Sequence, residues 1–134
     1  SLDYGTESEL IDALVYNVFP NFAPWWGFIP SIVYRWQTGK TPDTCIMEVR
    51  IIARVKKGEP IPRGVPRNFL RLDQKWTEAP ELGGLGAVFE QDMDNLPFVQ
   101  DGLHCSKNGK IQLADYQEIR IRQFHQTMDK YLNA

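Results

Sequence analysis

Residues 44–57, TCIMEVRIIARVKK, constrain the fold most, because their apolar and polar side chains alternate with a period of two. One side carries Cys45, Met47, Val49, Ile51, Ala53 and Val55, and the other carries Glu48, Arg50 and Arg54. A period of two is typical of a β-strand that buries one face and leaves the other in water. A turn cluster, TGKTPD, precedes this strand, and the strand-like SIVYRWQ precedes the turn. The pattern predicts a long antiparallel hairpin with one wet face.

The segments around this hairpin carry weaker patterns. The first 12 residues are acidic, and we expect a turn or a short helix there. ALVYNVFPNF alternates, with Leu14, Tyr16 and Val18 on one side, and predicts a strand that Pro20 ends. FAPWWGFIP is rich in aromatic residues and proline, and is expected to be a connection between strands. GEPIPRGVPRNFLRLD, with three prolines, is expected to be a connector without helix or strand.

Two helices are predicted in the second half of the chain. The first covers about residues 85–103, with an interruption near residues 95–97 because proline disfavours a helix interior. The second begins within ADYQEIRIRQFHQTMDKYL, where Asp115 and Glu118 have the spacing of a capping box. Its apolar stripe consists of Ile121, Phe124, Met128 and Tyr131. The predicted fold class is therefore α+β, an antiparallel β-sheet packed on a long C-terminal helix.

The composition argues against several classes of protein. The net charge of −2, from 15 basic and 17 acidic residues, does not indicate binding to nucleic acid or to a membrane surface. No apolar run approaches the roughly 20 residues of a membrane span, and no signal peptide is visible. The two cysteines, Cys45 and Cys105, lack the CxxC spacing of a zinc site. We therefore expect reduced thiols in a cytoplasmic protein.

Three carboxylates, Glu90, Asp92 and Asp94, stand within five residues of the segment GAVFEQDMDNLPFVQDGL. On a helix, Glu90 and Asp94 share one face, whereas Asp92 points to roughly the opposite side. An inward carboxylate needs a partner, a proton or a metal ion, because an unpaired buried charge is very costly. The chain has two histidines, His104 and His125, and they do not form an HxxxH pair. Capping of the next segment, an ion pair with an arginine, and metal ligation all remain open for Asp92.

Four segments in this order resemble Rieske-type ring-hydroxylating oxygenases: YNVFPNF, YRWQTGKTPD, VFEQDMDNLPFVQDGL and YQEIRIRQFHQTMDKYL. The resemblance covers about residues 14–132 and is to the C-terminal part of the α-subunit catalytic domain. It implies a partial helix-grip fold, in which a curved antiparallel sheet surrounds a long C-terminal helix with an apolar cavity between them. Residues 1–134 would then be the C-terminal part of one catalytic domain, and the Rieske domain would be absent from this chain.

The resemblance also implies a role for Asp92. In this family an aspartate of the EQD stretch is the carboxylate of a 2-His-1-carboxylate triad on mononuclear iron(II). The family pattern places it eight residues before the glutamine of a VQxGL-like segment; counting back from Gln100 gives Asp92, and Asp94 is less favoured. Glu90 and Asp94 would be solvent charges or would support the metal ligand. The family's two histidine ligands come from an upstream motif to which nothing in this chain corresponds.

A substrate pocket is predicted around the same aspartate. Val88 and Leu85 lie one and two helical turns before Asp92 and face the same side. Asn17 and Phe19 share a strand face, and in the family the FPN strand borders the substrate pocket. The alternative for all four residues is an ordinary core or loop position.

For the intact enzyme, the resemblance implies a mechanism with an electron-transfer partner. A ferredoxin or reductase feeds a Rieske [2Fe–2S] cluster, whose CxH…CxxH motif is absent from this chain. The cluster passes electrons to the iron, usually across a subunit boundary in a homotrimer or α3β3 assembly. The iron uses O2 to dihydroxylate or monooxygenate an aromatic or other apolar substrate. We expect this chain alone to be inactive. The alternative function is a helix-grip module that binds an apolar small molecule without metal or catalysis.

Overall fold

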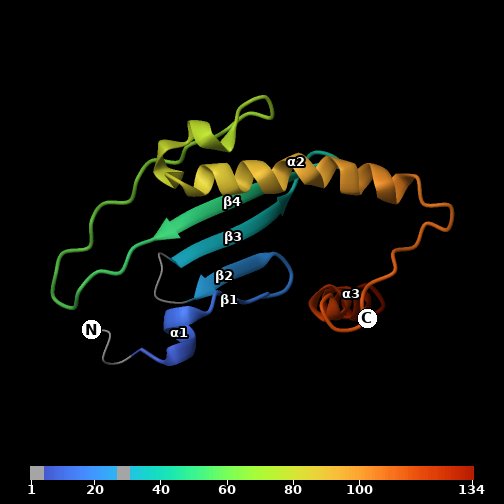
Figure 1. The fold of residues 1–134 in the computed structure, drawn as a ribbon, viewed down its shortest axis with the longest axis horizontal. Helices are drawn as coiled ribbons and strands as arrows, with labels where there is room; N and C mark the ends of the chain where they lie inside the picture. The colour runs from blue at the N-terminus through green and yellow to red at the C-terminus, as the bar shows by residue number, and fades with distance from the viewer. Residues whose placement is uncertain (1–4, 27–30) are drawn as a thin grey trace. The chain divides into compact units, whose positions relative to one another are not determined.

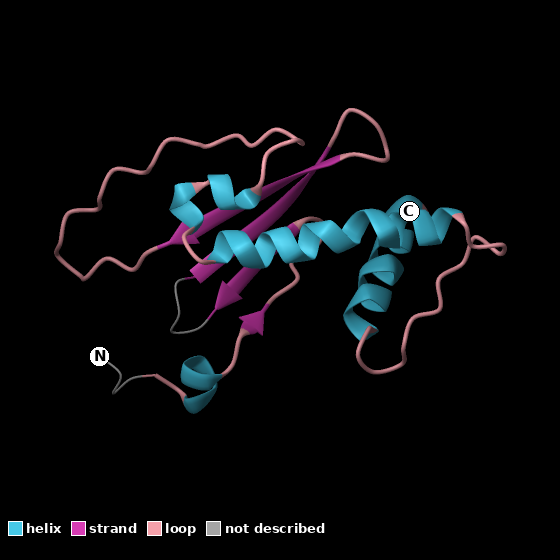
Figure 2. Cartoon of the chain, turned by 45° about the horizontal axis from the view of Figure 1, so that its top comes forward, coloured by secondary structure: helices cyan, strands magenta, loops and turns pink. Residues whose placement is uncertain are grey.

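The computed structural model describes residues 5–26 and 31–134. The chain divides into two compact units, one formed by Ser1–Glu59 with Leu113–Ala134 and the other by Pro60–Gln112. The first unit contains an antiparallel sheet and two helices, and the second contains one long helix and two short 3-10 helices (Figures 1 and 2). The predicted α+β fold class is therefore confirmed.

The sheet of the first unit is a meander in which each strand pairs with its neighbours along the chain, in the order β1-β2-β3-β4 (Figure 1). Its strands are β1 Leu14–Val15, β2 Phe22–Trp26, β3 Ser31–Thr38 and β4 Cys45–Ile52. The β3–β4 pair extends over all eight residues, from Ser31 opposite Ile52 to Thr38 opposite Cys45. The predicted hairpin is thus confirmed, although β4 ends at Ile52 and not at residue 57.

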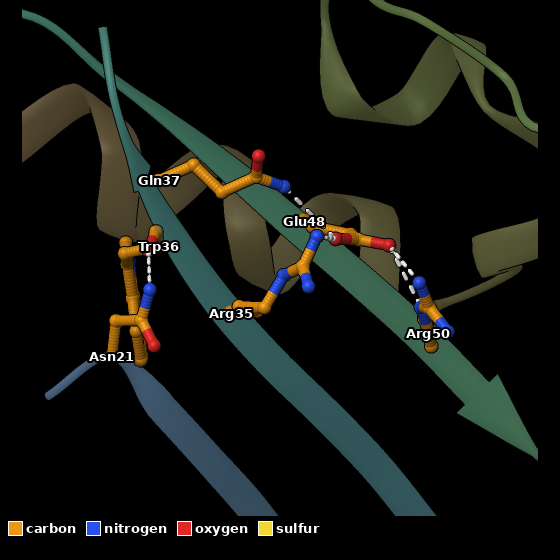
Figure 3. A network of polar contacts seen from close by, with 6 residues as sticks. All are labelled: Asn21, Arg35, Trp36, Gln37, Glu48 and Arg50. Atoms are coloured by element: carbon orange, nitrogen blue, oxygen red, sulfur yellow. Dashed lines mark hydrogen bonds and ion pairs between the residues drawn. The ribbon is translucent and has the colours of Figure 1, made fainter. Parts of the chain in front are cut away.

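The two faces of this hairpin carry different side chains, as the alternation predicts, but burial does not alternate along β4, so the predicted single wet face is wrong. Tyr34 lies opposite Val49 on one face, and Arg35 lies opposite Glu48 on the other. The Glu48 side chain is only 19% exposed, and its carboxylate lies 2.9 Å from the Arg35 guanidinium and 2.5 Å from that of Arg50 (Figure 3). Gln37 donates a further hydrogen bond to Glu48 at 3.2 Å. The polar face is therefore organised around one carboxylate that two arginines share.

The N-terminal half of the sheet differs from the prediction in two ways. The strand predicted in ALVYNVFPNF is limited to Leu14–Val15, because the chain already turns back between Val18 and Phe22, which form an isolated antiparallel bridge. The predicted connection FAPWWGFIP is also wrong in its described part, since Phe22–Trp26 is strand β2. Pro24 cannot donate to the ladder, but its carbonyl still accepts a hydrogen bond from the Tyr16 backbone N–H at 3.0 Å, so one link to the neighbouring segment remains. Residues 27–30 of that segment lie outside the described residues.

Helix α1, Glu7–Ile11, confirms the expected short helix near the N-terminus. Thr6 caps it, and the capping box with Glu9 is complete in both directions. Helix α3, Ile119–Leu132, is the predicted C-terminal helix. Phe19, in the connection between β1 and β2, stacks on its apolar stripe, with ring centroids 5.5 Å from Phe124 and 5.2 Å from Tyr131. These aromatic contacts link α3 to the sheet-bearing part of the first unit.

The start of α3 differs from the predicted capping box. The N-cap is Glu118, and its carboxylate accepts a hydrogen bond from the backbone N–H of Ala114. Asp115 instead lies 3.7 Å from the Arg122 guanidinium, which also donates to the Ala114 carbonyl at 2.9 Å. The segment before α3 is thus held by side chains that reach back from the helix, and this leaves Asp115 outside the cap.

The second unit consists of η2 Trp76–Glu78, η3 Pro80–Leu82 and α2 Leu85–His104. The segment between β4 and η2 has no helix or strand, as predicted. Ala79, Leu82 and Phe89 form the buried part of this unit. The predicted interruption of α2 is wrong, because the helix continues through Pro97. Proline costs a helix one backbone hydrogen bond, and here Pro97 lies at an exposed position of the helix, where its ring meets no packed neighbour among the described residues.

Candidate functional site

One face of α2 packs within the second unit. Phe89 is 3% exposed, and its ring centroid lies 5.2 Å from that of Trp76. The Glu90 carboxylate accepts a 2.8 Å hydrogen bond from the Trp76 backbone N–H. Gly86 lets η2 approach, since a Cβ there would lie 3.0 Å from the Trp76 carbonyl oxygen. Glu90 is therefore a half-buried anchor of η2 and not a solvent charge; its other expected role, support of the metal ligand, stays a prediction.

Asp92 lies in an apolar stripe of α2, on the side away from Glu90 and next to Phe89, which is three residues earlier. Val88 and Leu96, four residues on either side of Asp92, are 51% and 54% exposed, and Val99 is 50% exposed. Leu85 is half-buried, and Asp92 itself is exposed. No described residue forms a hydrogen bond or an ion pair with the Asp92 carboxylate. This removes the cap and the arginine pair as roles for Asp92 within the described part of the chain.

The donor set for a metal ion is incomplete in this chain. Among the described residues, no group of three or more His, Cys, Asp or Glu side chains is placed to hold a metal ion. The imidazole Nε2 of His104 lies 3.0 Å from the amide nitrogen of Gln100, and His125 is exposed on α3. The fit to a mononuclear iron site is therefore limited to one oxygen ligand, and the described residues alone do not form the site.

The first unit contains an open groove between the β1–β2 connection and α3. It consists of two adjoining hollows of about 450 and about 370 Å³. Both are lined by Val15, Tyr16, Asn17, Arg120 and Phe124. The larger hollow extends to Trp36 and Ala23, and the smaller one extends to Phe19 and Thr127. Of the predicted pocket residues, the structure thus brings Asn17 and Phe19 together, while Leu85 and Val88 lie on α2 in the other unit.

Sequence reasoning missed Arg120 as a groove residue. Arg120 stands four residues before Phe124, so helical spacing places it beside the apolar stripe that the sequence did predict. Its guanidinium donates to the Gln123 side-chain oxygen at 3.0 Å and has no carboxylate within 4 Å among the described residues. The four-residue spacing between Arg120 and Phe124 was therefore the signal in the sequence that could have identified Arg120 as a groove residue.

Comparison with known proteins places the chain in a family. It matches the family model of the ring hydroxylating alpha subunit (catalytic domain) over residues 1–134, which is its whole length. Comparisons with curated proteins and with solved structures gave no match. Within residues 5–26 and 31–134, no helix has the length and apolar character needed to cross a membrane. The chain belongs to the catalytic domain of the ring-hydroxylating oxygenase α subunits, of the Rieske type that its sequence resembles.

Proposed function

We propose that this chain is the C-terminal part of the catalytic domain of a Rieske-type oxygenase, and that Asp92 is its ligand to mononuclear iron(II). The enzyme would use iron and O2 to hydroxylate an aromatic or other apolar substrate. The observation that carries the proposal is the position of Asp92, which is a carboxylate without a described partner within the exposed apolar stripe of α2. The family match supports the oxygenase class.

The apolar stripe favours ligation over solvation. An exposed apolar face is a surface that other parts of a protein cover, because its burial releases water. Once Val88 and Leu96 are covered, the carboxylate between them loses its hydration and requires a cation or a proton. Iron(II) bound by two imidazoles and a carboxylate keeps open positions, and it supplies the oxidising chemistry. The two imidazoles would come from a part of the catalytic domain outside this chain.

The remaining predicted residues have supporting roles in this proposal. Leu85 and Val88 precede Asp92 on the same face of α2, and would present apolar surface to a substrate near the iron. Asn17 and Phe19 line the groove of the first unit and would contact the substrate there. Small-molecule sites in proteins combine such apolar walls with a few polar groups that orient the ligand.

The proposed partners follow from the same family. A Rieske [2Fe–2S] domain outside this chain would deliver electrons that a ferredoxin or reductase supplies. The assembly would be a homotrimer or an α3β3 complex, located in the cytoplasm. This chain alone would then be inactive, because it lacks the cluster and two of the three iron ligands.

A second candidate is a helix-grip module that binds an apolar small molecule without metal. Two observations favour it: the described residues contain no three-ligand cluster, and the groove of the first unit is lined by aromatic side chains. Metal analysis separates the two candidates, because only the oxygenase requires iron.

The test is iron and acid-labile sulfide analysis of the full-length protein that contains this chain. About three irons and about two sulfides per subunit are expected for one Rieske cluster and one mononuclear site. Asp92→Ala should remove about one iron and leave the sulfides and the visible spectrum of the cluster unchanged, which also reports that the protein is folded. Asp94→Ala, two residues away, is the matched control and should retain all the iron. Full iron content in the Asp92→Ala protein would overturn the assignment.

A further inference from the structure

The groove of the first unit has the size and the walls of a small-molecule site. Its two hollows of about 450 and about 370 Å³ are within the range of roughly 300–1,000 Å³ that is usual for ligand pockets. Tyr16, Trp36 and Phe124 supply aromatic surface. Planar apolar ligands pack well on such surfaces, because aromatic rings combine a large buried area with favourable ring–ring geometry.

The two ends of the groove differ in polarity. Pro20, Ala23 and Trp36 line the end toward the sheet together with the polar Asn21, and this end is the more apolar one. Gln123 and Thr127 of α3 line the other end together with Phe19. Asn17 and Arg120 belong to both hollows, so they lie where the apolar end meets the polar end. A ligand that matches this arrangement has an apolar ring at one end and a polar group beside Arg120.

The hydrogen-bond donors that Arg120 leaves unused indicate which polar group of a ligand would fit beside it. Arginine has five N–H donors, and the described residues use one of those of Arg120, in the 3.0 Å hydrogen bond to Gln123. Arg122 on the same helix differs, because Asp115 and the carbonyls of Leu113 and Ala114 already surround it. The planar fork of an arginine matches a carboxylate, which can accept two parallel hydrogen bonds from it.

We propose that this groove binds an aromatic carboxylate, with the ring against Tyr16, Trp36 and Phe124 and the carboxylate on Arg120. The inference rests on the proposed function in one respect, since it takes the ligand of this groove to be the substrate of the oxygenase. It narrows the substrate class from apolar compounds in general to aromatic acids. Arg120 is then a specificity-determining residue that orients the ring through the acid group.

The test compares 2-naphthoate with its neutral analogue 2-naphthamide, titrated into the full-length protein that contains this chain. Binding is measured by calorimetry and by quenching of tryptophan fluorescence, to which Trp36 contributes. Arg120→Gln should weaken naphthoate binding about fivefold and leave naphthamide binding unchanged, because an exposed guanidinium–carboxylate pair contributes on the order of 1 kcal/mol. Arg120→Lys should restore part of the loss, and Trp36→Phe should remove most of the quenching.

Lys130→Gln is the matched control, since it removes one positive charge from the last turn of the same helix. It should change neither affinity. In the unmodified chain, added salt should weaken naphthoate binding and leave naphthamide binding unchanged, so the proposal stays testable if Arg120→Gln fails to fold. Equal affinity for the acid and the amide, absence of binding, or an equal loss for both ligands in Arg120→Gln would overturn the proposal.

This experiment is independent of the iron assignment. If Asp92→Ala retains iron in the full-length protein while naphthoate binds through Arg120, the iron ligand is wrong and the groove assignment stands. If iron is lost in Asp92→Ala while naphthoate and naphthamide bind equally, the oxygenase assignment stands and the substrate class is wrong.

Discussion

The backbone N–H of Trp76 donates a 2.8 Å hydrogen bond to the carboxylate of Glu90, fourteen residues further along the chain. This bond joins η2 to one face of α2, and Phe89 packs on the Trp76 ring beside it. Because Asp92 is two residues after Glu90, helical spacing turns it away from Glu90, and Asp92 is exposed. One acidic residue thus anchors the helix, and the other is left available for a ligand.

Loss of the Glu90 carboxylate should destabilise the second unit. Glu90→Ala is expected to lower the free energy of unfolding by about 1–3 kcal/mol, because the half-buried Trp76 N–H loses a charged acceptor. Glu90→Gln should cost less, since its side-chain oxygen can still accept the bond. The measurement is urea unfolding followed by tryptophan fluorescence. Asp94→Ala, also on α2 but exposed, should change the free energy by less than about 0.5 kcal/mol; equal effects would contradict the anchoring role.

Neighbouring apolar residues of α2 should differ sharply in their effect on stability. Phe89→Ala removes a ring that is 3% exposed and packs against Trp76, and should cost about 3–5 kcal/mol. Val88→Ala, at a site that is 51% exposed, should cost less than about 1 kcal/mol. Chemical unfolding of the 134-residue chain provides both values. A large loss in Val88→Ala would show that the apolar stripe of α2 is already covered in this chain.

The polar face of the β3–β4 hairpin should lose stability when its shared carboxylate is removed. Glu48→Ala leaves Arg35 and Arg50 side by side without their common acceptor, and should cost about 1–2 kcal/mol. A double-mutant cycle with Arg35→Ala should give a coupling energy of about 0.5–1 kcal/mol that falls as salt is added. A coupling energy of zero would mean that the 2.9 Å contact between Arg35 and Glu48 does not contribute to the stability of the fold.

Titration of Glu78 should reveal the structure of the turn before α2. The Lys75 backbone N–H donates to the Glu78 carboxylate at 2.9 Å, and the Gln74 side chain donates at 3.2 Å, so the pKa of Glu78 is held below its ordinary value of 4.5. Since the folded pKa is the lower one, this contribution to stability is complete above the ordinary value and is lost as the pH falls through the folded value. Carbon NMR of the carboxyl group measures this shift.

Replacement of Gln74 tests the cause of that shift. Gln74→Ala should move the pKa of Glu78 part of the way back toward its ordinary value, because the backbone donor remains. Gln91→Ala, at an exposed position of α2, should leave the titration unchanged. An unaltered pKa in Gln74→Ala would assign the whole effect to the Lys75 N–H.

The sequence pattern predicted those elements whose structure depends mainly on residues close together in the chain. The hairpin of β3 and β4 was predictable because a turn cluster separates two strand-like segments, the second of which carries Met47, Val49 and Ile51 on one side and Glu48 and Arg50 on the other. Strand β2 was missed because Pro24 argues against a strand, and the sequence does not show that its carbonyl pairs with the Tyr16 N–H. Pro97 likewise led to the wrong prediction of an interrupted helix. The twenty-residue α2 continues through it, because the remaining contacts of the helix outweigh one missing hydrogen bond.

The candidate site was predictable only in part, for a similar reason. Helical spacing placed Asp92 opposite Glu90, and the packing of Glu90 on Trp76 agrees with that. The spacing did not show that Glu90 would be an anchor, because the Trp76 N–H comes from a segment with no pattern of its own. Arg120 escaped notice since its importance depends on Tyr16 and Asn17, which are distant in sequence and adjacent only in the fold.

The order of the strands has a consequence for how the chain assembles. Residues 14–52 form a meander of neighbouring strands, so the sheet can form early from contacts that are short in sequence. Helix α3 belongs to the same unit but is synthesised only after the whole of Pro60–Gln112, so its docking on Phe19 closes a long loop. The entropic cost of closure grows only slowly with loop length, and the intervening unit can therefore vary in length at little cost to that docking. Until α3 emerges, Phe19 lacks its contacts with Phe124 and Tyr131, so this aromatic surface stays open to solvent during synthesis.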